Sequence, residues 1–167
     1  MAFELYLIRH GLSEQRGTYE DDGQRPLTDE GKKKSRRVAK QLRHLGLQFD
    51  RILSSPLVRA RQTADILVDV GLGANVEAAS FLAPDGNIGD WLDWLATWIR
   101  SNDSNLVLVG HEPDLSTWAE HLVWGEARQT LTLKKAGVIG LTLPETGSPI
   151  GRSALFWLVP PRLLIGR

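Results

Sequence analysis

Two apolar segments that lie about a hundred residues apart end in the same way, with a histidine beside a glycine. Residues 5–8 lead into His10, and residues 107–109 lead into His111. Short apolar runs of this kind are typical of buried strands in a parallel sheet, and ligands of such sheets bind beyond the carboxyl ends of the strands. The repeated ending therefore predicts an α/β sheet that brings both histidines to one edge.

Strand and helix patterns alternate along the rest of the chain. The expected strands are residues 3–8, 51–54, 75–79, 106–109, 131–133, 138–143 and 155–159. The expected helices are residues 29–45 with Thr28 as the cap, 56–70 with Pro56 first and Gly71 after the end, 88–100, and 113–124. This alternation predicts an α/β fold: a single three-layer domain over residues 1–167, with a mostly parallel central sheet, helices on both faces, an antiparallel edge and no cap domain.

The composition excludes several classes of protein. The chain has no Cys, which rules out disulfide scaffolds, Cys-based zinc sites, iron–sulfur clusters and enzymes with a Cys nucleophile. Twenty basic and twenty acidic residues cancel, so net charge gives no argument for nucleic acid or an anionic membrane as a partner. No apolar run approaches the ~18 residues of a membrane span, and the start lacks the basic region of a signal peptide. We therefore expect a cytoplasmic protein.

Two helices carry patterns that could be mistaken for binding sites. The helix at 29–45 has seven basic residues, which we interpret as a solvated face above packed Val38, Ala39, Leu42 and Leu45, with a docking surface for an acidic partner as the alternative. The seven are Lys32, Lys33, Lys34, Arg36, Arg37, Lys40 and Arg43. Trp91, Trp94 and Trp98 fall on the apolar arc of the helix at 88–100, which predicts core packing rather than ligand stacking.

Arg59 lies in the first turn of a helix, where a positive charge does not stabilise the helix. It lies in the first turn of the helix that follows Ser55-Pro56, outside the apolar arc of that helix, although helix N-termini favour anions. An anion held between Arg59 and the helix N-terminus would explain this placement, with a plain surface arginine as the alternative. His44 and His121 lack such a setting, and we expect them to be structural or surface residues.

Taken together and in order, four motifs resemble the histidine phosphatase superfamily, which has the phosphoglycerate-mutase-like fold, and most resemble its SixA-type phosphohistidine phosphatase branch. The motifs are Arg9-His10-Gly11, residues 25–31 (RPLTDEG), residues 54–63 (SSPLVRARQT) and Gly110-His111. The resemblance implies that His10 attacks a phosphoryl group and becomes phosphorylated, while Arg9, Arg59 and His111 hold the phosphoryl oxygens and water completes the hydrolysis. It implies no metal and no cofactor.

The chemistry of these residues agrees with that role. Two guanidinium groups can grip a phosphoryl group, and a neutral imidazole is a competent nucleophile near pH 7. Gly11 lets the backbone turn close to the phosphate, and the N–H of Glu112, at the start of the next helix, is a further donor. Two arginines at the same place argue against zinc on His10 and His111.

The sequence departs from the family at two places. Larger members carry an Asn shortly after the first motif, and residues 11–16 contain none. Many members use an acid after the third strand to protonate the leaving oxygen. Asp85 is the near candidate there, although Pro-Asp-Gly is also a common turn.

Three functions stay open at this point. The leading one is hydrolysis of phosphohistidine in proteins, because imidazole leaves more easily than an alkoxide and needs no placed acid. The second is a phosphomonoesterase acting on a small phosphorylated metabolite, with Asp85 or Glu14 as the acid. The third is a phosphate-binding module with little turnover.

Overall fold

Six strands form one sheet, which orders the chain so that distant segments end at the same edge. The computed structural model describes residues 3–166. Its strands are β1 (Phe3–Arg9), β2 (Arg51–Ser54), β3 (Val76–Ala78), β4 (Asn105–Gly110), β5 (Val138–Leu143) and β6 (Ala154–Val159). They lie in the order β3-β2-β4-β1-β5-β6, with the first four parallel and β5 and β6 antiparallel to their neighbours. The predicted parallel sheet with an antiparallel edge is confirmed.

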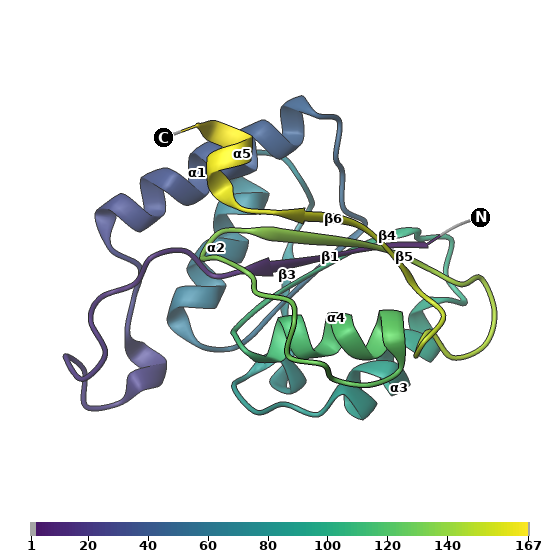
Figure 1. Ribbon diagram of the computed structural model, residues 1–167. Coiled ribbons are helices and arrows are strands. Elements are labelled where there is room, and N and C mark those ends of the chain that lie inside the picture. Colours follow the sequence, from purple (N-terminus) through teal and green to yellow (C-terminus); the bar gives the residue numbers. More distant parts are fainter. Residues whose placement is uncertain (1–2, 167) are drawn as a thin grey trace.

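Helices cover both faces of this sheet. They are α1 (Asp29–His44), α2 (Val58–Asp69), α3 (Ile88–Trp98), α4 (Asp114–Trp124) and α5 (Pro161–Ile165), with short 3-10 turns at Asp22–Gln24 and Ser80–Leu82. Figure 1 shows α1, α2 and α5 on one face and α3 and α4 on the other, which confirms the three layers. Thr28 caps α1 as predicted, since its side chain accepts the N–H of Gly31.

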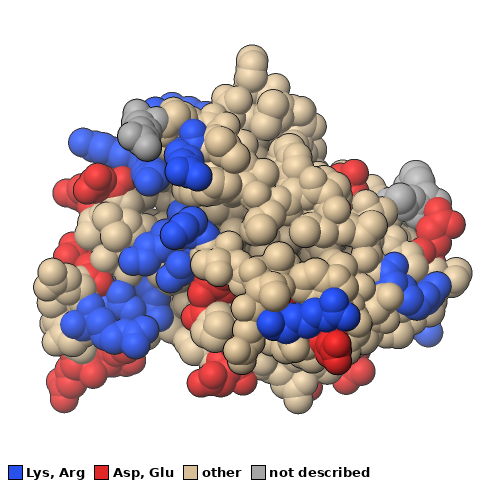
Figure 2. Space-filling view, in the orientation of Figure 1, with Lys and Arg blue, Asp and Glu red and all other residues tan. Residues whose placement is uncertain are grey.

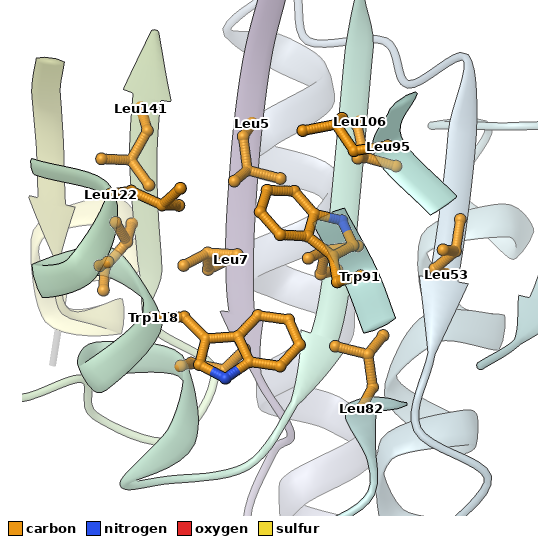
Figure 3. Packing of buried hydrophobic residues seen from close by; sticks show 14 of the residues in the cluster. Leu5, Leu7, Leu53, Leu82, Trp91, Leu95, Leu106, Trp118, Leu122 and Leu141 are labelled. Carbon is orange, nitrogen blue, oxygen red and sulfur yellow. The ribbon is translucent and has the colours of Figure 1, made fainter. Parts of the chain in front are cut away.

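Each face of the sheet has its own apolar core because side chains alternate along a strand. Leu5 and Leu7 of β1 face α3 and α4, where the rings of Trp91 and Trp118 stack with centroids 5.8 Å apart (Figure 3). Trp91 and Trp98 are buried, as predicted for core packing. Trp94 is only partly buried, and the guanidinium group of Arg51 lies over its ring.

The basic residues of α1 are all exposed, while Val38, Ala39 and Leu42 pack below them, as predicted. The prediction was wrong for Leu45, which is 48% exposed. Leu45 is the residue after the last turn of α1, next to Gly46 at a φ of 88°, and Leu47 and Phe49 pack against the core in its place.

Two predicted elements differ in the structure. Residues 131–133 form no strand, because the carboxylates of Glu120 in α4 and of Glu112 just before α4, rather than a neighbouring strand, accept the N–H groups of Leu131 and Leu133. The second helix begins at Val58 and not at Pro56. Ser55 continues the sheet edge by donating its N–H to the carbonyl of Val109, and Leu57, the residue before α2, still has an extended backbone. The short helix α5 was not predicted.

Candidate active site

His10 is the first residue beyond β1, at the carboxyl edge of the sheet. It is 6% exposed, and its backbone N–H donates to the carbonyl of Gly110, which ties β1 to the end of β4. Its ring nitrogen Nδ1 lies 2.8 Å from the carbonyl oxygen of Gly11. A carbonyl oxygen can only accept, so Nδ1 carries the proton and the lone pair of the ring is on Nε2.

Burial keeps the His10 ring neutral. Desolvation lowers the pKa of His10 to about 3, against the opposing hydrogen bond to Gly11, and the nearby charges of Arg59 and Arg9 lower it further. The ring is therefore uncharged at neutral pH and offers a free lone pair. That is the state required of a nitrogen nucleophile.

His111 follows β4 and faces His10, with the two ring centroids 5.2 Å apart. Its Nε2 lies 2.7 Å from the hydroxyl oxygen of Ser55, which also accepts the N–H of Leu57. With that N–H accepted, the Ser55 hydroxyl can donate its own proton to Nε2, which leaves the ring proton of His111 on Nδ1. Burial and the charge of Arg59 lower the pKa of His111 to about 4, so this ring is a neutral hydrogen-bond donor.

Arg59 comes from the first turn of α2 and is only 4% exposed. Its Nη1 donates to the backbone carbonyl of Asp22, and its Nη2 lies 3.2 Å from the Asp22 carboxylate. Arg25 holds the same carboxylate through its Nε at 2.9 Å, and this hydrogen bond lowers the pKa of Asp22. The Nε of Arg59 is buried and has no partner among the described residues.

Arg9 is oriented by the loop between α4 and β5. Its Nη1 donates to the carbonyl of Leu133 at 3.1 Å, and its Nε is buried with no partner among residues 3–166. The N–H of Leu133 donates to the Glu112 carboxylate at 2.8 Å, and that carboxylate also accepts from Ser116. The position of Arg9 thus depends on a loop that a side chain holds in place.

Glu120 fixes the same loop at its other end. Its carboxylate accepts the backbone N–H groups of four consecutive loop residues and the hydroxyl of one of them. The four are Arg128, Gln129, Thr130 and Leu131. Burial alone would raise its pKa, but these hydrogen bonds outweigh it and lower the pKa of Glu120 to about 2. The carboxylate therefore stays ionised and bound to the loop down to strongly acidic pH.

The side chains of the two histidines and the two arginines described above line one open cleft of about 760 Å³. The residues of the sequence prediction that line it are Arg9, His10, Arg59, His111, Glu112 and Glu14. Two predicted residues lie elsewhere. Gly11 donates its N–H to the Thr63 hydroxyl, so that N–H is not free for phosphate, and a side chain at this position would collide with Ser35. Asp85 is exposed in a turn at a φ of 64°, where its N–H donates to Asp114.

Several residues in or behind the cleft were not assigned a role from the sequence. Ser55 binds His111, Thr63 joins Gly11 to the first turn of α2, and Asp22 pairs with Arg59. Arg25 lines the cleft as well. The signals available for this group were the motifs themselves, since Arg25 lies in the second motif and Ser55 and Thr63 lie in the third. Within residues 3–166, no group of three or more His, Asp or Glu side chains is arranged to hold a metal ion, and no helix is long and apolar enough to cross a membrane.

The neutral buried histidines make stability depend on pH. Between pH 7.5 and 5.5 the imidazoles of the unfolded chain take up protons, while those of His10 and His111 in the fold do not. The free energy of unfolding should therefore fall by about 1.4 kcal/mol for each of the two histidines as the pH drops. Urea unfolding in phosphate-free buffer at the two pH values measures this.

The variant His10→Gln/His111→Gln is the control for this measurement, because it keeps every other titratable group. Its pH dependence over the same range should be smaller by about 2–3 kcal/mol. An equal pH dependence in both proteins would contradict neutral burial of the two rings.

Comparison with known proteins adds to this geometry. The sequence model of the histidine phosphatase superfamily (branch 1) matches residues 5–97. An uncharacterised protein of Picosynechococcus sp. is 50% identical over 138 residues, which cover 83% of this chain and 84% of the relative. The phosphohistidine phosphatase SixA of Escherichia coli is 27% identical over 146 residues, covering 87% and 88%. The solved structure of the protein histidine phosphatase SixA complexed with tungstate superposes with a TM-score of 0.85 at 25% identity, covering 97% of this chain and 99% of that one. The predicted fold family is confirmed.

Proposed function

Since the chain belongs to branch 1 of the histidine phosphatase superfamily and is a phosphatase that works through a histidine, we propose that its substrates are proteins phosphorylated on histidine. In this proposal His10 is the nucleophile, and Arg9, Arg59 and His111 hold the phosphoryl oxygens. The N–H of Glu112 is a further donor at the start of the segment that leads into α4.

The reaction proceeds in two displacements. Nε2 of His10 attacks phosphorus, and the bond between phosphorus and the substrate imidazole breaks, with a proton from solvent completing the departing ring. His10 then carries the phosphoryl group on Nε2 and a proton on Nδ1, where the carbonyl of Gly11 stabilises the cationic ring. Water attacks phosphorus, phosphate leaves with a proton released to solvent, and His10 returns to its neutral form.

The arginines and His111 supply charge where it develops. Phosphoryl transfer depends mainly on positioning and on stabilising the equatorial oxygens. The Nε atoms of Arg9 and Arg59 and Nδ1 of His111 are buried N–H groups without partners in the described residues, which suits them to bind those oxygens. These three unpaired donors support a tetrahedral oxyanion as the ligand of the cleft.

One observation favours phosphohistidine over a phosphate ester: among the described residues, neither of the two carboxylates that are held in place in the cleft is placed as a protonated acid. Of the three carboxylates that line the cleft, Asp22 is held ionised by Arg25 and Arg59, and Glu112 is bound to Leu133 and Ser116. Asp85 lies outside the cleft. An alkoxide leaving group requires an acid, whereas imidazole, with a pKa near 6.5, departs with a solvent proton.

The experiment that tests the proposal compares leaving groups. We expect kcat/KM for a phosphohistidine peptide to exceed that for an alkyl phosphate by about 100-fold or more, the contribution of one missing general acid. An alkyl phosphate that is turned over as fast as the peptide would instead identify a phosphomonoesterase. Binding of both substrates without turnover would identify a phosphate-binding module.

Two conservative variants locate any acid that does act. Asp85→Asn and Glu14→Gln should each leave phosphohistidine turnover unchanged within about twofold, because neither substitution removes a contact to the proposed phosphoryl site. Glu14 is exposed at the rim of the cleft and is the one lining carboxylate, among the described residues, without a side-chain partner. A loss confined to the alkyl phosphate would assign that residue as the acid of an esterase. Equal large losses on both substrates would show that it positions phosphate or water.

A further inference from the structure

A second groove continues from the candidate active site along the same edge of the sheet. It has a volume of about 790 Å³ and shares Arg9 and Lys135 with the cleft that holds His10. Its walls are the loop at residues 132–135, the end of β6, the start of α5 and one residue of α1. Val138, the first residue of β5, pairs with Ile8 of β1 and with Val159, the last residue of β6. The groove therefore runs past the start of β5 and the end of β6, away from the two histidines of the cleft.

The charge of this groove is of one sign. Beyond Arg9, its lining carries four cationic side chains, all exposed, and no acidic one. The four are Lys34, Lys134, Lys135 and Arg162. Within the part of the chain that the structure describes, none of them forms an ion pair with a carboxylate. Figure 2 shows basic side chains gathered at the left of the molecule, where this edge of the sheet lies.

This local excess is a feature of the surface rather than of the whole chain, whose formal net charge is zero. Elsewhere, arginines are commonly paired, as Arg36 is with Asp69 and Arg61 with Asp65. The groove also has an apolar component, since Leu158, Pro160 and Pro161 line it beside the lysines. Unpaired cations above an apolar floor suit a peptide segment that carries carboxylates and apolar side chains.

We propose that this groove binds an acidic segment of the substrate protein that flanks the phosphohistidine. The proposal rests on the proposed function, which places the phosphoryl group between Arg9 and His10. A chain that leaves the phosphohistidine past Arg9 enters the groove directly, and Lys135 lies at the junction of the two hollows. The groove adds affinity for the protein around the phosphoryl group and has no part in the chemical step.

Two peptides and two variants test this. The peptides carry one phosphohistidine flanked by either glutamates or serines, and p-nitrophenyl phosphate reports on the chemical step alone. Lys34→Glu/Lys134→Glu reverses two charges of the groove without touching the catalytic cleft. Lys33→Glu/Lys40→Glu is the matched control, because it changes the net charge equally at exposed residues of α1 that do not line the groove.

At low salt we expect the wild-type protein to prefer the glutamate-flanked peptide. The groove variant should have a kcat/KM for this peptide about tenfold below that of the wild type, and an unchanged kcat/KM for p-nitrophenyl phosphate. Its kcat/KM for the glutamate-flanked peptide should depend only weakly on salt, as that of the wild type does for the serine-flanked peptide. The control variant should behave as the wild type. Equal kcat/KM for both peptides in the wild type, or equal losses in the groove and control variants, would overturn the proposal. An equal loss on p-nitrophenyl phosphate would do so as well.

Failure of the proposed function has a different signature. If neither peptide is dephosphorylated, the protein is not a phosphohistidine phosphatase, and the groove is then tested by binding alone. Fluorescence anisotropy with an unphosphorylated glutamate-rich peptide should show about tenfold weaker binding to Lys34→Glu/Lys134→Glu than to Lys33→Glu/Lys40→Glu. Equal binding to both variants would rule out an acidic peptide as the ligand of the groove.

Discussion

His10→Ala should abolish phosphatase activity, lowering kcat/KM by at least about 1000-fold on every substrate, because the variant has no covalent route to the phosphoryl group. His10 is the proposed nucleophile because the lone pair on its Nε2 is free, whereas Ser55 occupies Nε2 of His111. The measurement is initial rate with a phosphohistidine peptide and with p-nitrophenyl phosphate. Acid-quenched intact mass should show a transient phosphoryl adduct in the wild type and none in the variant.

Loss of activity is informative only if the fold survives. The side chain of His10 donates to one neighbouring carbonyl and carries no core packing, so His10→Ala should keep the circular dichroism and the cooperative unfolding of the wild type. His44→Ala is a matched control, because His44 is an exposed histidine at the end of α1. Residual turnover of more than a few per cent in His10→Ala would refute the assignment of the nucleophile.

Arg59→Ala should lower kcat/KM by about 10² to 10³-fold, the usual effect of removing one preorganised donor from a developing oxyanion. Arg59→Lys should recover only part of this, because an ammonium group cannot reproduce the fork with which a guanidinium binds two oxygens. Inorganic phosphate should also bind more weakly to both variants, which isothermal titration calorimetry can measure.

Arg61 provides the control for this prediction. It lies in the same helix two residues further on, is exposed and pairs with Asp65, and does not line the cleft. Arg61→Ala should therefore retain the activity of the wild type within about twofold. If both alanine variants lose activity equally, the effect is one of helix stability or general charge, and the role assigned to Arg59 is wrong.

The regular parts of the fold follow from local signals. The apolar run before His10 becomes β1, Thr28 caps α1, and Gly71 at a φ of 87° follows the end of α2. Because parallel strands end at one edge, the endings of β1 and β4 also predicted that His10 and His111 would lie together, and their rings are 5.2 Å apart. These elements could be predicted from the sequence because each is determined by a few neighbouring residues.

The irregular parts depend on partners that are distant in sequence. The apolar residues at 131–133 have the composition of a strand, but Glu120 and Glu112 accept the N–H groups that a strand would pair. No local sequence pattern predicts that distant carboxylates will accept these N–H groups in place of a neighbouring strand. The contact of Ser55 with His111 and that of Asp22 with Arg59 likewise span tens of residues, so they became visible only once the sheet had brought their segments together.

The way in which Arg9 is held has a consequence for how such an enzyme can diverge. Its anchor is the backbone carbonyl of Leu133, and the loop that presents this carbonyl is fastened by the carboxylates of Glu112 and Glu120. The side chains of Thr132, Lys134 and Lys135 are exposed and take no part in that fastening. Those positions should therefore tolerate exchange while His10 and the proposed oxyanion donors stay in place. If the groove binds the substrate protein as proposed, grafting these few surface residues from a relative is expected to change which flanking segment is preferred.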